Sequence, residues 1–216
     1  MEAINSFVVF FNNGGHFMYP ITVVLALSLA TSIERFVFLG KSLRENRKLW
    51  AKVSPMLSAD DLTEAQALVG KSKVAVARIL NEGLDKAASA RRRSELEMAT
   101  EDSLISILPT IERRTHYLAT FSNAATLLGL LGTVFGLITA FGALGGADPI
   151  EKANLLSAGI SEAMSCTAFG LMVAIPSLFA HAYLQSQAEE LVNTLESACV
   201  RFVSLVSNSS AVHFKS

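Results

Sequence analysis

Hydrophobic positions are concentrated in long blocks along the chain, separated by polar segments. Three apolar runs extend from about Phe17 to Leu39, Leu118 to Leu144 and Leu155 to Leu184. Each run exceeds the ~20 residues that an α-helix needs to cross a ~30 Å hydrocarbon core. If these runs were buried helices of a soluble protein, the rest of the 216 residues would leave too little polar chain to cover them. The pattern predicts an all-α membrane protein with three transmembrane helices.

The polar segments also carry helical patterns, which predict long cytoplasmic helical extensions. Ser58 to Asp61 is typical of a helix start, because Ser and Asp cap exposed N–H groups, and Gly70 is expected to end that helix. From Ala90 to Leu144 there is no turn signal, so a single helix is expected there, kinked or missing one hydrogen bond at Pro109. The pattern of the third run continues through residues 185–202.

The distribution of Lys and Arg predicts the orientation in the membrane. Residues 1–16 contain none, residues 40–117 contain 14, and the link 145–154 contains only Lys152. Because Lys and Arg are enriched in cytoplasmic loops, the long middle segment is expected in the cytoplasm. The predicted segments are a periplasmic N-terminus (1–16), transmembrane helix 1 (17–39), a cytoplasmic helical segment (40–117), transmembrane helix 2 (118–144), a periplasmic loop (145–154), transmembrane helix 3 (155–184) and a cytoplasmic helical tail (185–216).

Composition narrows the class of function. Hydrophobic residues make up 51% of the chain and charged residues 17%, and the formal net charge is -1. A near-neutral chain lacks the basic balance of a general nucleic-acid binder. The basic runs at residues 91–93 and 113–114 are instead interpreted as topology determinants or as contacts to lipid head groups.

No motif in the chain predicts enzyme chemistry, a cofactor or a metal site. We find no Walker A, GxSxG or HExxH motif and no cluster of Cys and His residues. The two cysteines, Cys166 and Cys199, fall in an apolar run and in the amphipathic tail, so no disulfide between them is expected. The chain is therefore expected not to be an enzyme.

Small residues recur every three or four positions in the second and third runs. This spacing puts them on one helix face, and small faces let helices approach closely in lipid. Proline at position 176 additionally frees a backbone carbonyl about one turn earlier. The residues predicted to pack these helices are Gly129, Gly132, Gly136, Gly170, Ala174 and Pro176.

Three polar side chains in these runs are candidates for a proton pathway. Thr133 and Thr167 fall near the midpoints of their spans, and Glu162 is a deep carboxylate nearer the outer end. At 100° per residue, Glu162 and Thr167 are about 140° apart around the helix, so a regular helix does not point both at one axis. A carboxylate in lipid is costly and should face protein or water.

The threonines allow two interpretations. Each hydroxyl could bond only its own helix backbone. Alternatively, the hydroxyls line a polar path, although threonine does not hold a proton at neutral pH. A relay at mid-membrane depth would then need a carboxylate from another chain.

The strings LLGLLGTVFGLITAF and GISEAMSCTAFGLMVAIPSLFA resemble the ExbB/TolQ/MotA proton-channel family. The three-span layout with a long segment after the first span is similar to the ExbB/TolQ branch, since MotA-type proteins typically have four spans. The pair Ser165-Cys166 before Thr167 departs from relatives that often have small or aliphatic residues there.

The resemblance implies a function and partners. Such proteins form an inner-membrane pentamer around a dimer of an ExbD/TolR-like single-span protein, and the proton motive force drives work on the cell envelope. Thr133 and Thr167 would resemble the polar ring that faces the partner's membrane aspartate, with Glu162 as a third site residue. The client stays open between TonB-dependent uptake, Tol-type envelope maintenance and motility, and the ion between proton and sodium. The alternative is a structural scaffold for a single-span partner without proton conduction of its own.

Overall fold

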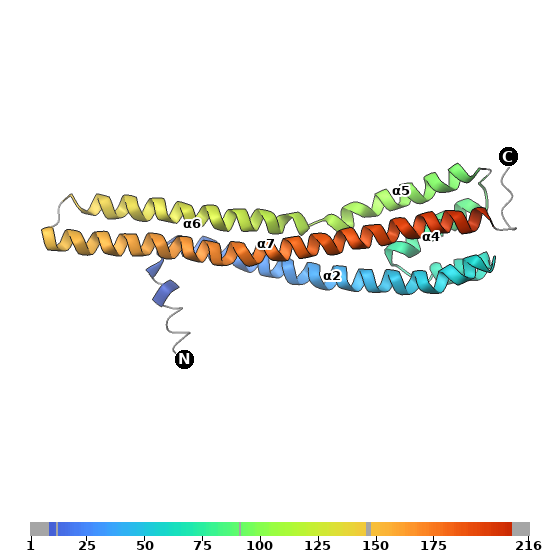
Figure 1. The fold of residues 1–216 in the computed structure, drawn as a ribbon, viewed down its shortest axis with the longest axis horizontal. Helices are drawn as coiled ribbons and strands as arrows, with labels where there is room; N and C mark the ends of the chain where they lie inside the picture. Colours follow the sequence, from blue (N-terminus) through green and yellow to red (C-terminus); the bar gives the residue numbers. More distant parts are fainter. Residues whose placement is uncertain (1–8, 12, 91, 146–147, 209–216) are drawn as a thin grey trace. The chain divides into compact units, whose positions relative to one another are not determined.

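The computed structural model describes residues 9–11, 13–90, 92–145 and 148–208 (Figure 1). No β-strand occurs among these residues. The chain divides into two compact units: unit 1 comprises Met1–Glu34 and Arg114–Tyr183, and unit 2 comprises Arg35–Arg113 and Leu184–Ser216. The helices are α2 (Met18–Ser58), α3 (Leu62–Val69), α4 (Ala75–Ala87), α5 (Arg93–Glu112), α6 (Thr115–Ala143) and α7 (Pro149–Ser207).

The helices confirm the prediction of an all-α membrane protein. Three helical stretches of the described residues are long and apolar enough to cross a membrane: Met18–Ser58, Arg93–Ala143 and Glu151–Ser207. Each stretch overlaps one of the three apolar runs and extends well beyond it, so the long helical extensions are confirmed as well.

Unit 1 contains the start of α2, all of α6 and the first part of α7. Its core is built by small and apolar side chains from all three helices, among them Met18 and Ile21 of α2, Ala125 of α6, and Phe169 and Val173 of α7. Many larger side chains of the same helices stay exposed, including Leu127 at 64% and Phe179 at 74%. The exposed apolar surface is what a helix bundle in lipid requires, because lipid tails solvate it.

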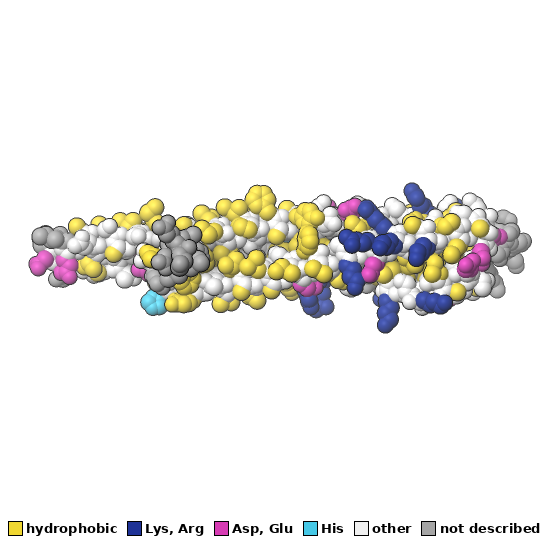
Figure 2. Space-filling view, turned by 90° about the horizontal axis from the view of Figure 1, so that it is seen from below, with side chains coloured by type: hydrophobic (Ala, Val, Ile, Leu, Met, Phe, Trp, Pro, Cys, Tyr) yellow, Lys and Arg dark blue, Asp and Glu magenta, His cyan; other side chains and the backbone are white. Residues whose placement is uncertain are grey.

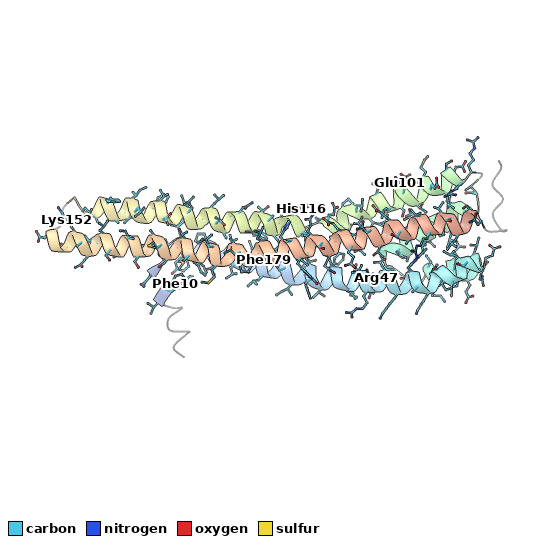
Figure 3. All side chains as sticks on the ribbon, in the orientation of Figure 1. Phe10, Arg47, Glu101, His116, Lys152 and Phe179 are labelled. Atoms are coloured by element: carbon cyan, nitrogen blue, oxygen red, sulfur yellow. The ribbon has the colours of Figure 1, made fainter. Side chains whose placement is uncertain are left out.

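Unit 2 packs α3, α4 and α5 against the remaining parts of α2 and α7. Helix α3 begins as predicted, since the Asp61 side chain accepts a hydrogen bond from the Glu64 N–H (3.1 Å), and it ends at Gly70. At Gly83 of α4 the ring of Phe202 lies where a Cβ would be, so the missing side chain lets the two helices approach. Arg47 of α2, labelled in Figure 3, forms an ion pair with Glu190 of α7.

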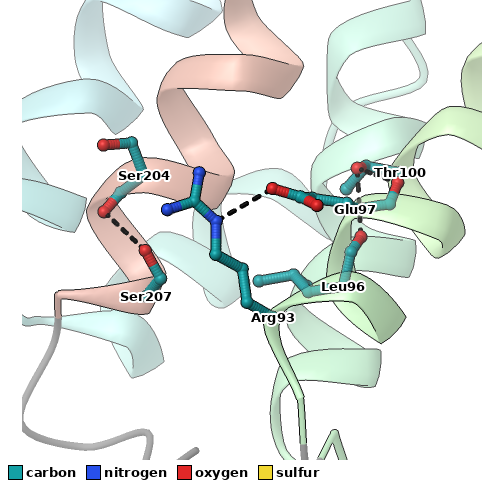
Figure 4. A network of polar contacts seen from close by, with 6 residues as sticks. All are labelled: Arg93, Leu96, Glu97, Thr100, Ser204 and Ser207. Carbon is teal, nitrogen blue, oxygen red and sulfur yellow. Dashed lines mark hydrogen bonds and ion pairs between the residues drawn. The ribbon is translucent and has the colours of Figure 1, made fainter.

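The first turns of α5 are stabilised by contacts within the helix (Figure 4). The N-cap residue Arg92 makes no side-chain capping bond. Instead, Arg93 pairs with Glu97 at 2.8 Å, and the buried Thr100 hydroxyl donates to the carbonyls of Leu96 and Glu97. Such i,i+4 pairs contribute only a few tenths of a kcal/mol, about 0.2–0.5 each, so α5 depends mainly on its buried face.

The expected single helix from Ala90 to Leu144 is wrong. Helix α5 ends at Glu112 and α6 begins at Thr115, and Arg114 between them has φ +70°, which a helix cannot contain. Pro109 lies inside α5 and is not the break, although it removes one helical N–H.

Arg35 of α2 accounts for the stability of this break. Its Nη1 donates to the carbonyl oxygens of Thr110 and Ile111 at 3.5 and 3.3 Å, and its side chain is almost fully buried. These are carbonyls that a continuing helix would satisfy with later N–H groups. Because a guanidinium satisfies them instead, the helix can end there.

Candidate functional site

The small residues of α6 and α7 face each other in unit 1. A Cβ at Gly129 would lie 3.2 Å from the Cα of Thr167, and one at Gly170 would lie 2.6 Å from the carbonyl oxygen of Ala125. One at Gly136 would lie 3.0 Å from the Cβ of Ala163. Positions rise along α6 as they fall along α7, so the two helices are antiparallel with their backbones in near contact. The structure thus places Gly129, Gly136 and Gly170 in the contact for which their spacing was singled out.

Gly132 packs differently, because a side chain occupies the space above it. The Sγ atom of Cys166 lies where a Cβ of Gly132 would project, and Cys166 is almost fully buried. Cys166 therefore fills a gap in the α6–α7 contact.

The Thr167 hydroxyl crosses from α7 to α6. It donates to the carbonyl oxygen of Gly129 at 2.9 Å. In the regular helix α6 this carbonyl also accepts the N–H of Thr133, four residues later. The two predicted site threonines are therefore connected through one peptide carbonyl.

The Thr133 hydroxyl bonds its own helix. It donates to the carbonyl oxygen of Leu130 at 2.5 Å, and the residue is half-buried. Of the two interpretations of the threonines, backbone bonding describes Thr133 in this chain, whereas Thr167 makes an interhelical bond. Both oxygens keep acceptor capacity, since a hydroxyl has two lone pairs.

Glu162 lies in a different environment from Thr167. Its Oε1 packs against Gly15, where a Cβ would collide with it, and Gly15 has φ +68°, which favours glycine. The carboxylate is half-buried. The structure therefore directs Glu162 toward the segment before α2 and Thr167 toward α6, in line with their angular separation.

Sequence reasoning missed a second set of hydroxyls, around Pro176. The Ser177 hydroxyl donates to the Val173 carbonyl at 2.7 Å and lies 2.7 Å from the hydroxyl of Ser28 in α2. The Ser122 hydroxyl of α6 donates to the carbonyl of Ala174 at 2.8 Å. Serines inside apolar runs were the available signal, because a hydroxyl away from water needs a hydrogen-bond partner within the protein.

The described residues offer no metal centre. No group of three or more His, Cys, Asp and Glu side chains in this part of the chain is placed to hold a metal ion.

Comparison with known proteins gives the family. Residues 71–197 match the MotA/TolQ/ExbB proton channel family. A biopolymer transport protein ExbB homologue of Methanothermobacter thermautotrophicus is 30% identical over 188 residues, which cover 86% of this chain and 65% of that protein. The chain thus spans slightly less than two thirds of the length of this relative.

Two bacterial relatives, one named ExbB-like and one named TolQ, point to the same family. An ExbB-like biopolymer transport protein of Synechocystis is 34% identical over 82% of this chain and 69% of its own length. A Tol-Pal system protein TolQ of Haemophilus influenzae is 35% identical over 96 residues, 44% of this chain and 40% of that protein. With its three apolar helices, the chain is a multi-pass protein of the inner membrane, and it belongs to the MotA/TolQ/ExbB proton channel family.

Proposed function

We propose that the chain is a proton-channel subunit of an energy-transducing complex that couples the proton motive force to work on the bacterial cell envelope. The observation that carries this proposal is the connection of Thr133 and Thr167 through the Gly129 carbonyl, which accepts the Thr167 hydroxyl of α7 and the Thr133 N–H of α6. The Thr167 hydroxyl bonds the Gly129 carbonyl and the Thr133 hydroxyl bonds the carbonyl of the next residue, Leu130, so two polar groups lie on adjacent peptides of an otherwise apolar span. Such polar groups can orient a carboxylate that gains and loses a proton.

The carboxylate is proposed to come from an ExbD/TolR-like single-span partner. Of the two carboxylates in the predicted spans, Glu34 lies at the cytoplasmic edge and pairs with Arg114 at 3.4 Å, and Glu162 packs against Gly15. Neither is directed at the threonines by these contacts. The homologues named ExbB and TolQ support a partner of this class.

The proposed assembly is a homo-oligomer, a pentamer around a partner dimer, with α6 and α7 as its inner wall and the start of α2 on the outside. The exposed apolar side chains of α6, such as Leu130 and Ile138, support contacts beyond this chain. The proposed orientation has a periplasmic N-terminus and a cytoplasmic C-terminus, with the segment bounds predicted from the sequence. TonB-dependent uptake, Tol-type maintenance and motility are the candidate clients, and no enzymatic step is ascribed to the chain.

The test is proton flux through the chain reconstituted with its partner in liposomes. Thr133→Val and Thr167→Val keep shape and remove each hydroxyl. We expect the double variant to lose at least 90% of the flux while it still co-purifies with the partner. Thr139→Val is the matched control, because this exposed α6 hydroxyl bonds only the Phe135 carbonyl, and it should conduct normally. Normal flux in the double variant would refute the proposed role of the threonines.

The alternative function is a structural scaffold for the partner. The bond between the Thr133 hydroxyl and its own helix favours it, since this group is already satisfied. A scaffold predicts no proton flux in the wild-type complex, with assembly intact. Replacing protons by sodium as the driving gradient in the same liposomes identifies the ion.

A further inference from the structure

A basic cavity lies in unit 2, away from the threonines. Its volume is about 770 Å³, and it is lined by residues of α2, α3, α4, α5 and α7 and of the loop between α3 and α4. This size is within the ~300–1,000 Å³ range of small-molecule sites. Its charged lining residues are five cations and one carboxylate: Lys48, Lys52, Lys71, Lys73, Arg78 and Glu45.

The positive charge of this cavity is poorly neutralised by the protein. The carboxylate of Glu45 pairs with Lys41 outside the lining at 3.9 Å, and Arg78 pairs with Glu82 at 3.4 Å. For the four lining lysines, no salt bridge to a described residue occurs. Figure 2 shows Lys and Arg side chains gathered beside exposed hydrophobic ones on one face. The lining therefore attracts an anion.

Helix α4 begins at this cavity and adds hydrogen-bond donors. Its N-cap residue Val74 supplies no side-chain cap, and its first turn contains no acidic residue. Asn46 accepts the N–H of Val76 at 2.7 Å, which holds the helix start in place. Ser72 adds a hydroxyl to the lining. Backbone N–H groups and the helix dipole at such a start favour a phosphate-like anion.

The cavity also has an apolar side, next to the predicted membrane. Phe38 belongs to the predicted first span, and Ile111 and Ile107 lie seven and eleven residues before the predicted second span begins at Leu118. A free inorganic anion has no apolar part to contact this surface, whereas a phospholipid carries a phosphate and an apolar part in the same molecule. We propose that the cavity binds the phosphate group of an anionic phospholipid, a ligand independent of the proposed proton conduction.

The test measures binding of phosphatidylglycerol to the full chain in detergent by native mass spectrometry, with phosphatidylcholine as the zwitterionic comparison. Lys71→Gln with Lys73→Gln should weaken phosphatidylglycerol binding roughly tenfold or more. Arg44→Gln with Lys86→Gln is the matched control, because both residues lie on α2 and α4 outside the lining and remove the same charge. Lys71→Arg with Lys73→Arg should restore binding.

The source of the phosphate is distinguished by competition. If millimolar inorganic phosphate displaces the lipid from the wild type, and does not displace the lipid that the Lys71→Gln, Lys73→Gln variant still binds, the cavity recognises the phosphate itself. If phosphate does not compete, the lipid as a whole is the ligand. The proposal would be overturned if the Lys71→Gln, Lys73→Gln variant bound the lipid as well as the wild type. It would also be overturned if the Arg44→Gln, Lys86→Gln control lost as much lipid binding as the lysine variant. These readouts do not involve proton flux, so they are separate from the test of the channel.

Discussion

The hydroxyl of Thr167 donates to the carbonyl oxygen of Gly129 at 2.9 Å, and so joins α7 to α6 where their backbones are in near contact. Gly129 retains its helical donor, the N–H of Thr133, when that hydroxyl is removed. Helix α6 therefore does not need the Thr167 hydroxyl to satisfy the Gly129 carbonyl.

We expect Thr167→Val to cost only about 0.6 kcal/mol of stability, the mean for interhelical hydrogen bonds in a membrane. Thermal unfolding in detergent measures this cost. Thr167→Ser, which keeps the hydroxyl, should retain proton flux where Thr167→Val loses it. Equal flux in the Ser and Val variants would mean that the methyl group and not the hydroxyl matters.

Gly170→Ala should separate α6 from α7. The new Cβ would lie 2.6 Å from the Ala125 carbonyl oxygen, so the backbones must move apart, at a cost of about 1–3 kcal/mol. A lower melting temperature in detergent is expected. The control is Gly142→Ala in α6, where nothing lies within 4 Å of the added Cβ. There the substitution should stabilise by ~0.5–1 kcal/mol, and a similar loss in both variants would contradict the packing argument.

Arg35→Gln should weaken the end of α5. The buried guanidinium bonds the carbonyls of Thr110 and Ile111, and hydrogen bonds to charged groups contribute about 1.5–3 kcal/mol. Faster trypsin cleavage after Arg113 is expected, along with a lower melting temperature. Arg44→Gln, an exposed change on the same helix, should leave both unchanged. An unaltered cleavage rate in the Arg35 variant would show that the break does not depend on this side chain.

Cys199 should react slowly with alkylating reagents. Burial, and secondarily the negative charge of Glu196, raises the pKa of its thiol to about 11 from the ordinary 9.0. Since the thiolate is the reactive form, alkylation at pH 8 should be about 100-fold slower than for an ordinary thiol and should rise with pH toward 11. Peptide-resolved mass spectrometry measures it.

The neighbouring exposed position supplies the control for Cys199. Val200→Cys in a Cys199→Ala chain puts a thiol at a site that is 70% exposed, and it should react at the ordinary rate. The Cys199 thiol ionises at a lower pH in the unfolded chain than in the folded chain. The raised pKa therefore favours the folded state below pH 9, and this stabilisation is lost between pH 9 and 11. Equal rates at the two positions would contradict the burial of Cys199.

Local signals were sufficient for the spans and for the start of α3. The three apolar runs are long enough to define membrane helices alone, and the Asp61 cap acts on a neighbour three residues away. The spacing of small residues likewise predicts which faces of α6 and α7 contact each other, because helix periodicity determines which residues share a face.

Contacts between distant residues were not predictable from local pattern. Beside the break at Arg114, the Thr110 carbonyl is bonded by Arg35, which is 75 residues away in sequence, and no glycine or proline marks the turn itself. The contact of Ser28 with Ser177 spans 149 positions. The hydrogen-bond partner of the Thr167 hydroxyl could not be predicted for the same reason. Helix periodicity gives the direction of a side chain, and it does not give the group that the side chain contacts.

The seating of the Cys166 thiol over Gly132 constrains how the two positions can diverge among descendants of this chain. Any side chain gained at position 132 needs the volume that the sulfur now occupies. A change to alanine at 132 is therefore tolerated only together with a reduction at 166, and the two positions are expected to drift as a volume-conserving pair.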